Sequence, residues 1–164
     1  MSRYFSPKYK DLTPYTPGEQ PRDQQYIKLN TNESPFPPSP RAQMYAKKAA
    51  EGLQLYSDPT CRALTARAAE MLGVEEEEIL FTNGSDEILN FAFMAFCDGN
   101  TGAAFPDITY GFYEVFAQLN AVPYEKIPLK DDFSIDVNDY IGLNKTIFIA
   151  NPNAPTGLIL PLSD

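Results

Sequence analysis

The sequence predicts an α/β fold with a mostly parallel sheet, preceded by an extended N-terminal arm. After about residue 60, segments of helix length alternate with short apolar segments of strand length, which is typical of helices that connect parallel strands. The first 40 residues instead hold 8 of the 15 prolines and show no regular apolar period. We therefore expect an arm over residues 1–40 and one α/β domain over residues 41–164.

The arm is expected to be extended because "SPFPPSP", residues 34–40, favours a polyproline-like conformation. A mobile tail and an arm docked on another surface both fit this composition. Docking is favoured by the apolar side chains that the arm carries: Tyr26, Ile27, Leu29 and Phe36.

Two helices are expected before residue 75. Residues 40–53, "PRAQMYAKKAAEGL", combine a proline in the first turn with good helix formers and a glycine near the end. A second helix should start near Asp58 or Thr60 and stop at Gly73. The apolar face predicted for this second helix is Leu64, Ala68, Met71 and Leu72.

The remaining elements are expected to alternate. Residues 75–83 should run from an acidic turn into a short apolar strand, and residues 84–98, "GSDEILNFAFMAFCD", should form a helix. The apolar face predicted for this helix is Ile88, Phe91, Ala92, Ala95 and Phe96. Strands are then expected within residues 102–107, 121–129 and 145–151, and helical segments within residues 110–120 and 136–142.

Composition excludes several kinds of function. The net charge of -9 disfavours a nucleic-acid partner, because a phosphate backbone selects basic surfaces. No apolar run approaches the roughly 20 residues that span a bilayer, and the N-terminus lacks a signal-peptide core, so we expect a cytoplasmic protein without a membrane partner. Two cysteines are too few for a disulfide framework. With no histidine, imidazole catalysis and histidine-ligated metals are excluded within this chain, and no metal site is expected.

A first candidate site lies in "FTNGSDEIL", residues 81–89. Asn83 and Gly84 turn the chain after the expected strand, and Ser85 and Asp86 open the next helix. The first amides of a helix have no partner inside it and lie at its positive end, so this turn could hold a phosphate. Taken alone, the stretch fits ordinary helix capping better, since serine and aspartate are common at helix starts.

Two further strand ends carry candidate ligand contacts. Tyr110, in "FPDITYGFY", could cover a flat aromatic ligand, although a core tyrosine is the commoner case. In "NPNAPTG", residues 151–157, the amide of Asn153 could donate to an anionic oxygen on a ring, and Pro155 is a candidate for a cis peptide bond. Ligands of open α/β sheets bind outside the carboxyl ends of the strands. Together the three strand ends therefore predict a site for a phosphorylated planar ring.

These motifs occur in a familiar order. "IKLNTNESPFPPSP", "LYSDP", "TNGSDEIL", "FPDITYGFY" and "NPNAPTG" resemble the fold-type I pyridoxal-phosphate aminotransferases over nearly the whole chain from about residue 26 to residue 157. The combination of "NGSDE" with "NPNAPTG" indicates the superfamily, and "LNTNESPFPPSP" points to its histidinol-phosphate aminotransferase branch.

The resemblance implies how the cofactor, pyridoxal 5'-phosphate, would be held. The backbone of Gly84, Ser85 and Asp86 would bind its phosphate, and Tyr110 would stack on its pyridine ring. Asn153 would bond the ring hydroxyl, because Ala154 occupies the place where the commoner family form has an asparagine directly before Pro-Thr-Gly.

The resemblance also implies contacts to substrate and to a second subunit. Tyr56 would reach the phosphate of the neighbouring subunit, which implies a homodimer. In the arm, Asn30, Asn32 and Glu33 would line the substrate entrance.

The implied reaction transfers an amino group between glutamate and imidazole-acetol phosphate in histidine biosynthesis. Family members carry the Schiff-base lysine, the partner of the pyridine nitrogen and the anion-binding arginines further along, so no catalytic residue is expected within residues 1–164. Residues 41–164 would then be the incomplete first part of the large pyridoxal-phosphate-binding domain, inactive alone. The alternatives are another aminotransferase or a threonine-phosphate decarboxylase of the same branch, or a non-catalytic truncated binding module.

Overall fold

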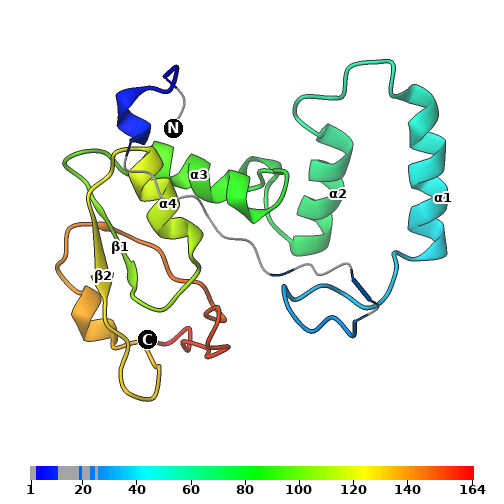
Figure 1. Cartoon of the computed structure of the whole chain (residues 1–164). Coiled ribbons are helices and arrows are strands. Elements are labelled where there is room, and N and C mark those ends of the chain that lie inside the picture. Colours follow the sequence, from blue (N-terminus) through cyan, green and yellow to red (C-terminus); the bar gives the residue numbers. More distant parts are fainter. Residues whose placement is uncertain (1–2, 11–18, 20–22, 25) are drawn as a thin grey trace. The chain divides into compact units, whose positions relative to one another are not determined.

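The computed structural model describes residues 3–10, 19, 23–24 and 26–164 (Figure 1). The chain divides into two compact units, one of residues 17–81 and one that contains residues 82–164. This division does not coincide with the domain boundary expected at residue 40, which stays a prediction about the whole protein.

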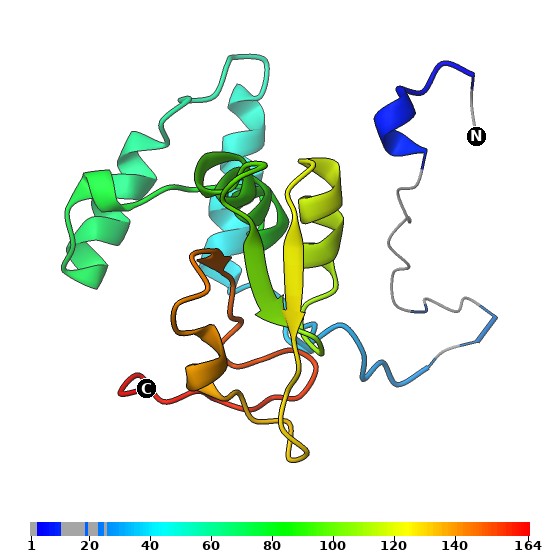
Figure 2. The same cartoon turned by 90° about the vertical axis from the view of Figure 1, so that its left-hand side faces the viewer.

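The unit that contains residues 82–164 is built on a parallel sheet. Strand β1 (Ala103–Pro106) lies between β2 (Tyr124–Ile127) and β3 (Thr146–Ile147), and it pairs with both in parallel. Figure 2 shows β1 in green and β2 in yellow side by side, with their arrowheads at the same end. All three strands lie where the sequence predicts them, although β3 is only two residues long. The mostly parallel sheet is therefore confirmed.

Helices connect these strands as expected. Helix α3 (Ser85–Phe96) precedes β1, and α4 (Phe112–Leu119) leads from β1 to β2. A short 3-10 helix, η4 (Val137–Tyr140), lies between β2 and β3. None of the helices in the described part of the chain is long and apolar enough to cross a bilayer.

Successive side chains of β1 belong alternately to two apolar clusters, one on each face of the sheet. Ala103 and Phe105 belong to the larger cluster, which α3 and α4 supply with Phe93, Tyr113, Phe116 and Ala117. Ala104, between them, belongs to the smaller cluster with Ile127 and Tyr140. Side chains of successive strand residues point to opposite faces, so the helices α3 and α4 cover one face and η4 covers the other.

The smaller cluster contains a polar group with no partner. The Tyr140 side chain is 7% exposed, and its hydroxyl makes no hydrogen bond to any residue that the structure describes. Burial, with lesser effects of the nearby charges of Asp107 and Asp139, raises the pKa of Tyr140 to about 12. A phenylalanine at this position would keep the ring packing and remove the unpaired hydroxyl.

We expect Tyr140→Phe to stabilise the fold by about 1 kcal/mol at neutral pH, because it removes the cost of burying an unbonded hydroxyl. The folded-state pKa lies above the ordinary value of 10.0. The unfolded chain therefore ionises first, and the parent loses stability as the pH rises from 10 through 12. The advantage of the variant should grow over this window, as measured by urea unfolding at pH 8, 10 and 11. A variant that is less stable than the parent at every pH would show that the hydroxyl has a partner.

The face of α3 that packs against the sheet differs from the predicted one. The core-facing side chains are Leu89, Phe93 and Cys97, together with the predicted Ala92, whereas the predicted Phe91 and Phe96 are 42% and 67% exposed. Nearly every position of this helix after its first turn is apolar, so the sequence contains no polar stripe from which to choose a face.

The strand expected at the end of residues 75–83 does not form. A 3-10 helix, η3 (Glu76–Glu78), occupies the acidic turn, closed by reciprocal bonds between Glu75 and Glu78. Ile79 has extended backbone angles, but the residues after it pair with no strand in the ranges described. An extended segment becomes a strand only when a neighbour supplies the other half of its hydrogen bonds.

The unit of residues 17–81 contains two helices and little core. Helix α1 (Pro40–Ala49) continues as the 3-10 helix η2 (Ala50–Gly52), and α2 (Arg62–Leu72) follows after a loop. The first is capped by Ser39, whose hydroxyl accepts from the Ala42 amide at 3.2 Å. Gly73 ends the second at a φ of 70°, as predicted.

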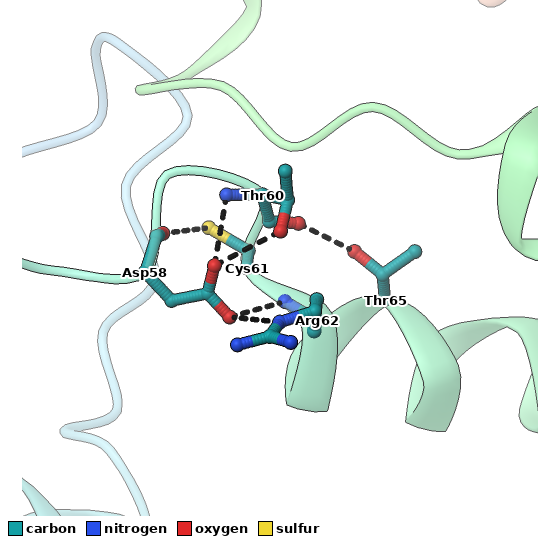
Figure 3. A network of polar contacts seen from close by, with 5 residues as sticks. All are labelled: Asp58, Thr60, Cys61, Arg62 and Thr65. Carbon is teal, nitrogen blue, oxygen red and sulfur yellow. Dashed lines mark hydrogen bonds and ion pairs between the residues drawn. The ribbon is translucent and has the colours of Figure 1, made fainter.

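Helix α2 begins slightly later than expected, and Asp58 is the reason. Its carboxylate accepts from the backbone amides of Thr60 and Arg62, both at 3.1 Å, and also contacts the Arg62 guanidinium (Figure 3). These bonds, with the Thr60 amide first, lower the pKa of Asp58 to about 2. The carboxylate thus closes the turn before the helix, and regular helix starts at Arg62.

The predicted apolar face of α2 is wrong for this chain. Leu64, Met71 and Leu72 are each more than half exposed, and only Thr65 and Ala69 of the helix are buried. A heptad-like apolar pattern shows that a helix can bury one face, but it does not show that a partner for that face lies within the same chain.

The arm carries its apolar side chains on the outside. Ile27 and Leu29 are each 90% exposed and Phe36 is 79% exposed. Tyr26 is about half exposed, and its hydroxyl donates to the carboxylate of Asp23. Docking of the arm on a second surface therefore stays a prediction.

Candidate functional site

The start of α3 has the geometry of an anion site. Gly84 precedes Ser85 with φ 81° and ψ 176°, a backbone conformation that only glycine adopts readily, and a Cβ placed on it would meet open space. Among the residues that the structure describes, none closes this end of the helix with a side-chain cap. Ordinary capping therefore does not account for the turn. The amides of Ser85 and Asp86 remain available to a ligand at the positive end of the helix.

The two carboxylates in the first turn are held by other donors. Asp86 accepts from the hydroxyl of Tyr110 at 2.5 Å, and Glu87 accepts from the backbone amide of Asn83 at 2.7 Å. Each bond ties a negative side chain to the protein. Both carboxylates are thereby fixed in position at the start of the helix.

Tyr110 joins the end of β1 to the start of α3. Besides its bond to Asp86, its ring stacks on Phe112, with centroids 5.7 Å apart, and meets Tyr113 edge-on at 5.8 Å. The ring is half-buried beside the core cluster, so both the ligand-covering and the packing interpretations of Tyr110 have support. The structure brings Tyr110 and the Gly84 turn together, although 24 residues separate Asp86 from Tyr110.

Asn153 lies in the turn of residues 151–157, after β3, and is 4% exposed. Its side-chain amide donates to the Ile108 carbonyl at 2.9 Å and to the Thr156 hydroxyl at 3.2 Å, while its oxygen accepts from the Thr109 hydroxyl at 2.8 Å. Both amide hydrogens are thus used within the protein, and a bond from Asn153 to a ligand ring stays a prediction. The candidate cis bond Ala154–Pro155 is cis, as is Asn151–Pro152.

The other predicted site residues belong to the unit of residues 17–81. Tyr56 is fully exposed. Asn30 donates to the Glu19 carbonyl at 3.0 Å, and Glu33 pairs with Lys28 at 2.5 Å, a contact that lowers the pKa of Glu33. Asn32 lies in the same turn with a φ of 53°. The structure gathers Asn30, Asn32 and Glu33 in one exposed turn.

Sequence reasoning missed two residues of the site, Thr109 and Thr156. Both act through hydroxyls on the buried Asn153 amide. Threonine is common in turns, and neither position carries a pattern that separates a buried partner from a solvated turn residue.

Comparison with known proteins gives consistent matches. The family model described as aminotransferase class I and II matches residues 24–164. A histidinol-phosphate aminotransferase of Brachyspira hyodysenteriae is 53% identical over 99% of this chain and 46% of its own length. The histidinol-phosphate aminotransferase of Clostridium acetobutylicum is 48% identical, over 100% of this chain and 47% of that protein. The chain therefore spans about half the length of these curated relatives.

Solved structures give the same result for the fold. Histidinol-phosphate aminotransferase from Sinorhizobium meliloti, solved in complex with pyridoxal-5'-phosphate, matches 94% of this chain and 44% of that chain, with a TM-score of 0.74 and 18% identity. An aminotransferase from Helicobacter pylori 26695 matches 95% of this chain and 43% of its own, with a TM-score of 0.68 and 25% identity. At 18% identity the first likeness supports the fold alone.

Proposed function

Because this chain belongs to the class I and II aminotransferase family, we propose that it is the N-terminal part of a pyridoxal-phosphate enzyme that transfers an amino group between glutamate and imidazole-acetol phosphate. The resemblance to fold-type I aminotransferases is confirmed by the family match and by the relatives that share about half of its residues. The proposed substrate is supported by those relatives, which are named histidinol-phosphate aminotransferases.

The observation that carries this proposal is the open start of α3 beside Tyr110. Backbone amides at the start of a helix are suited to binding a phosphate, and α3 offers those of Ser85 and Asp86. A planar ring needs an aromatic cover within reach of that phosphate, and the hydroxyl of Tyr110 is bonded to the first turn itself. The residues present therefore fit pyridoxal phosphate.

In this proposal the chain binds and orients, while the bound cofactor supplies the electron sink for amino transfer. Gly84 would permit close approach of the phosphate, the amides of Ser85 and Asp86 would hold it, and Tyr110 would cover the ring and exclude water from one side. The turn that contains Asn30, Asn32 and Glu33 offers exposed polar groups for the substrate entrance. The catalytic lysine would come from the part of the relatives that residues 1–164 do not cover.

Tyr56 is proposed to bond the cofactor phosphate of a second subunit in a homodimer, which its full exposure permits. Tyr56→Phe keeps the ring and removes only the hydroxyl, so cofactor affinity of the intact enzyme should fall about tenfold, the lower end for a bond to a charged group. Cofactor should also strengthen dimerisation more in the parent than in the variant, as measured by sedimentation with and without cofactor. Unchanged affinity together with a lower melting temperature would make Tyr56 a packing residue instead.

The reaction itself is tested on the intact enzyme loaded with pyridoxal phosphate. We expect kcat/KM for histidinol phosphate with 2-oxoglutarate to exceed that for phenylalanine by about a hundredfold or more, a difference of about 2.7 kcal/mol in transition-state binding. A preference for phenylalanine would identify an aromatic aminotransferase, and release of carbon dioxide from threonine phosphate a decarboxylase of the same branch. Cofactor binding without turnover of any of the three would support a non-catalytic module.

A further inference from the structure

The side chain of Asn153 makes three hydrogen bonds, two of them to a distant part of the chain. We call Asn153 and its three partners, Ile108, Thr109 and Thr156, the Asn153 junction. Two of its bonds link the loop that follows β1 to the turn of residues 151–157, across 44 and 45 positions of sequence. The backbone of Asn153 is also fixed, because its amide donates to Leu158 at 2.8 Å and its carbonyl accepts from Gly157 at 2.7 Å.

The loop held by this junction is the one that presents Tyr110. Ile108 and Thr109, which bond Asn153, immediately precede that tyrosine. The hydroxyl at the far end of the Tyr110 ring is bonded to Asp86. The tyrosine is therefore fixed at two ends, at its backbone by the junction and at its hydroxyl by the first turn of α3.

A direct bond from Asn153 to a cofactor ring would disrupt this arrangement. The amide has two hydrogens, and both are donated within the junction. Turning either hydrogen toward a ligand would leave the Ile108 carbonyl or the Thr156 hydroxyl without its donor. Because Asn153 is only 4% exposed, water would not easily replace that donor, and the lost hydrogen bond would cost stability.

We propose that Asn153 is a positioning residue: it fixes the loop of residues 108–109 against the turn of residues 151–157 and so sets the place of the Tyr110 ring beside the start of α3. The inference rests on the proposed function only in taking that ring as the cover of the cofactor. The junction itself is a property of the chain with or without cofactor.

Thr109→Val in the intact enzyme tests whether Asn153 positions the loop of residues 108–109 or bonds the cofactor ring directly. Valine keeps the shape of threonine and removes the hydroxyl that donates to Asn153, and Thr109 has no part in the proposed ligand contacts. We expect Thr109→Val and Asn153→Ala each to weaken cofactor binding about three- to tenfold and to reduce the visible circular dichroism of the bound cofactor. The double variant should match the stronger single variant within about twofold, because both changes remove one coupled unit. Thr101 is exposed, so Thr101→Val serves as the matched control and should leave both the cofactor affinity and the circular dichroism unchanged.

The pH dependence of the bound cofactor's absorption decides between positioning and ring contact. A positioning residue leaves the midpoint of that spectral titration within about 0.3 units of the parent value, since no group bonded to the ring has changed. A shift of about one unit or more in Asn153→Ala, with Thr109→Val indistinguishable from the parent, would overturn the proposal and make Asn153 a ring ligand.

Hydrogen exchange of the cofactor-free enzyme tests the junction without any ligand. Amides of residues 107–110 should exchange about tenfold faster in Thr109→Val and Asn153→Ala than in the parent, because local opening of the loop becomes easier. Unchanged exchange would overturn the proposal. If the enzyme bound no pyridoxal phosphate, the proposed function would fail, but faster exchange in this loop would still support the junction.

Discussion

Phe93→Ala should lower the free energy of unfolding of the intact enzyme by about 3–5 kcal/mol, the range for truncating a large buried aromatic side chain. Phe93 is 0% exposed and lies at the centre of the larger apolar cluster. Its ring stacks on Phe148 with centroids 4.2 Å apart and 4° between the planes, and it packs against Phe116 at 6.0 Å. Because Phe93 lies in α3 and its partners lie in α4 and in the segment after β3, the cavity would weaken the packing of all three segments.

Phe91→Ala is the matched control for this change, since it removes the same side chain from the same helix. Phe91 is 42% exposed and lies outside the buried cluster, so we expect a loss of less than about 1.5 kcal/mol. Urea unfolding of both variants gives the comparison. A larger loss in Phe91→Ala than in Phe93→Ala would mean that the core-facing side of α3 is not the one seen in the structure, and that the face first expected from the sequence is the correct one.

The extent of α3 was predictable from the sequence, whereas its orientation was not. Gly84 and the polar Ser85–Glu87 segment mark the helix start, and these signals are local. Which of Phe91, Phe93 and Phe96 faces the sheet depends on how the helix is attached to β1. That attachment depends on tertiary packing, and the sequence of an almost uniformly apolar helix does not indicate which face packs against the sheet.

In the candidate site, too, local sequence signals predicted some features, whereas others depend on contacts made only in the folded chain. The placement of the Gly84 turn near Tyr110 follows from the rule that ligand sites lie at strand ends, and the structure brings these residues together. It does so even though residues 79–81 form no strand, because the turn depends on Gly84 and not on the pairing before it. The buried role of Asn153 depends on two threonine hydroxyls that meet it only in the folded chain, so no local pattern could have indicated it.

Ser85→Pro should weaken binding of pyridoxal phosphate to the intact enzyme by about 10- to 100-fold, which corresponds to about 1.5–3 kcal/mol for one hydrogen bond to a charged group. Ser85 is the first residue of α3, the helix position that tolerates proline best. A proline also disfavours helical backbone angles in the residue before it, and Gly84 has a ψ of 176°, which is not helical. The substitution therefore removes one backbone donor and leaves the helix in place. Position 86 is less suitable, because Asp86 also holds Tyr110 and any change there alters two contacts at once.

Ser85→Ala is the control that makes the result specific to the backbone. Alanine removes the hydroxyl but keeps the amide, so cofactor affinity should fall by less than about threefold if the start of α3 binds phosphate through its backbone. Cofactor dissociation constants are measured by fluorescence titration, and far-ultraviolet circular dichroism checks that both variants retain the helix. Equal losses in the proline and alanine variants would assign the phosphate contact to the Ser85 hydroxyl. An unchanged constant in Ser85→Pro would mean that the phosphate lies elsewhere, and the site proposed at this helix start would then be wrong even if the enzyme proved to be an aminotransferase.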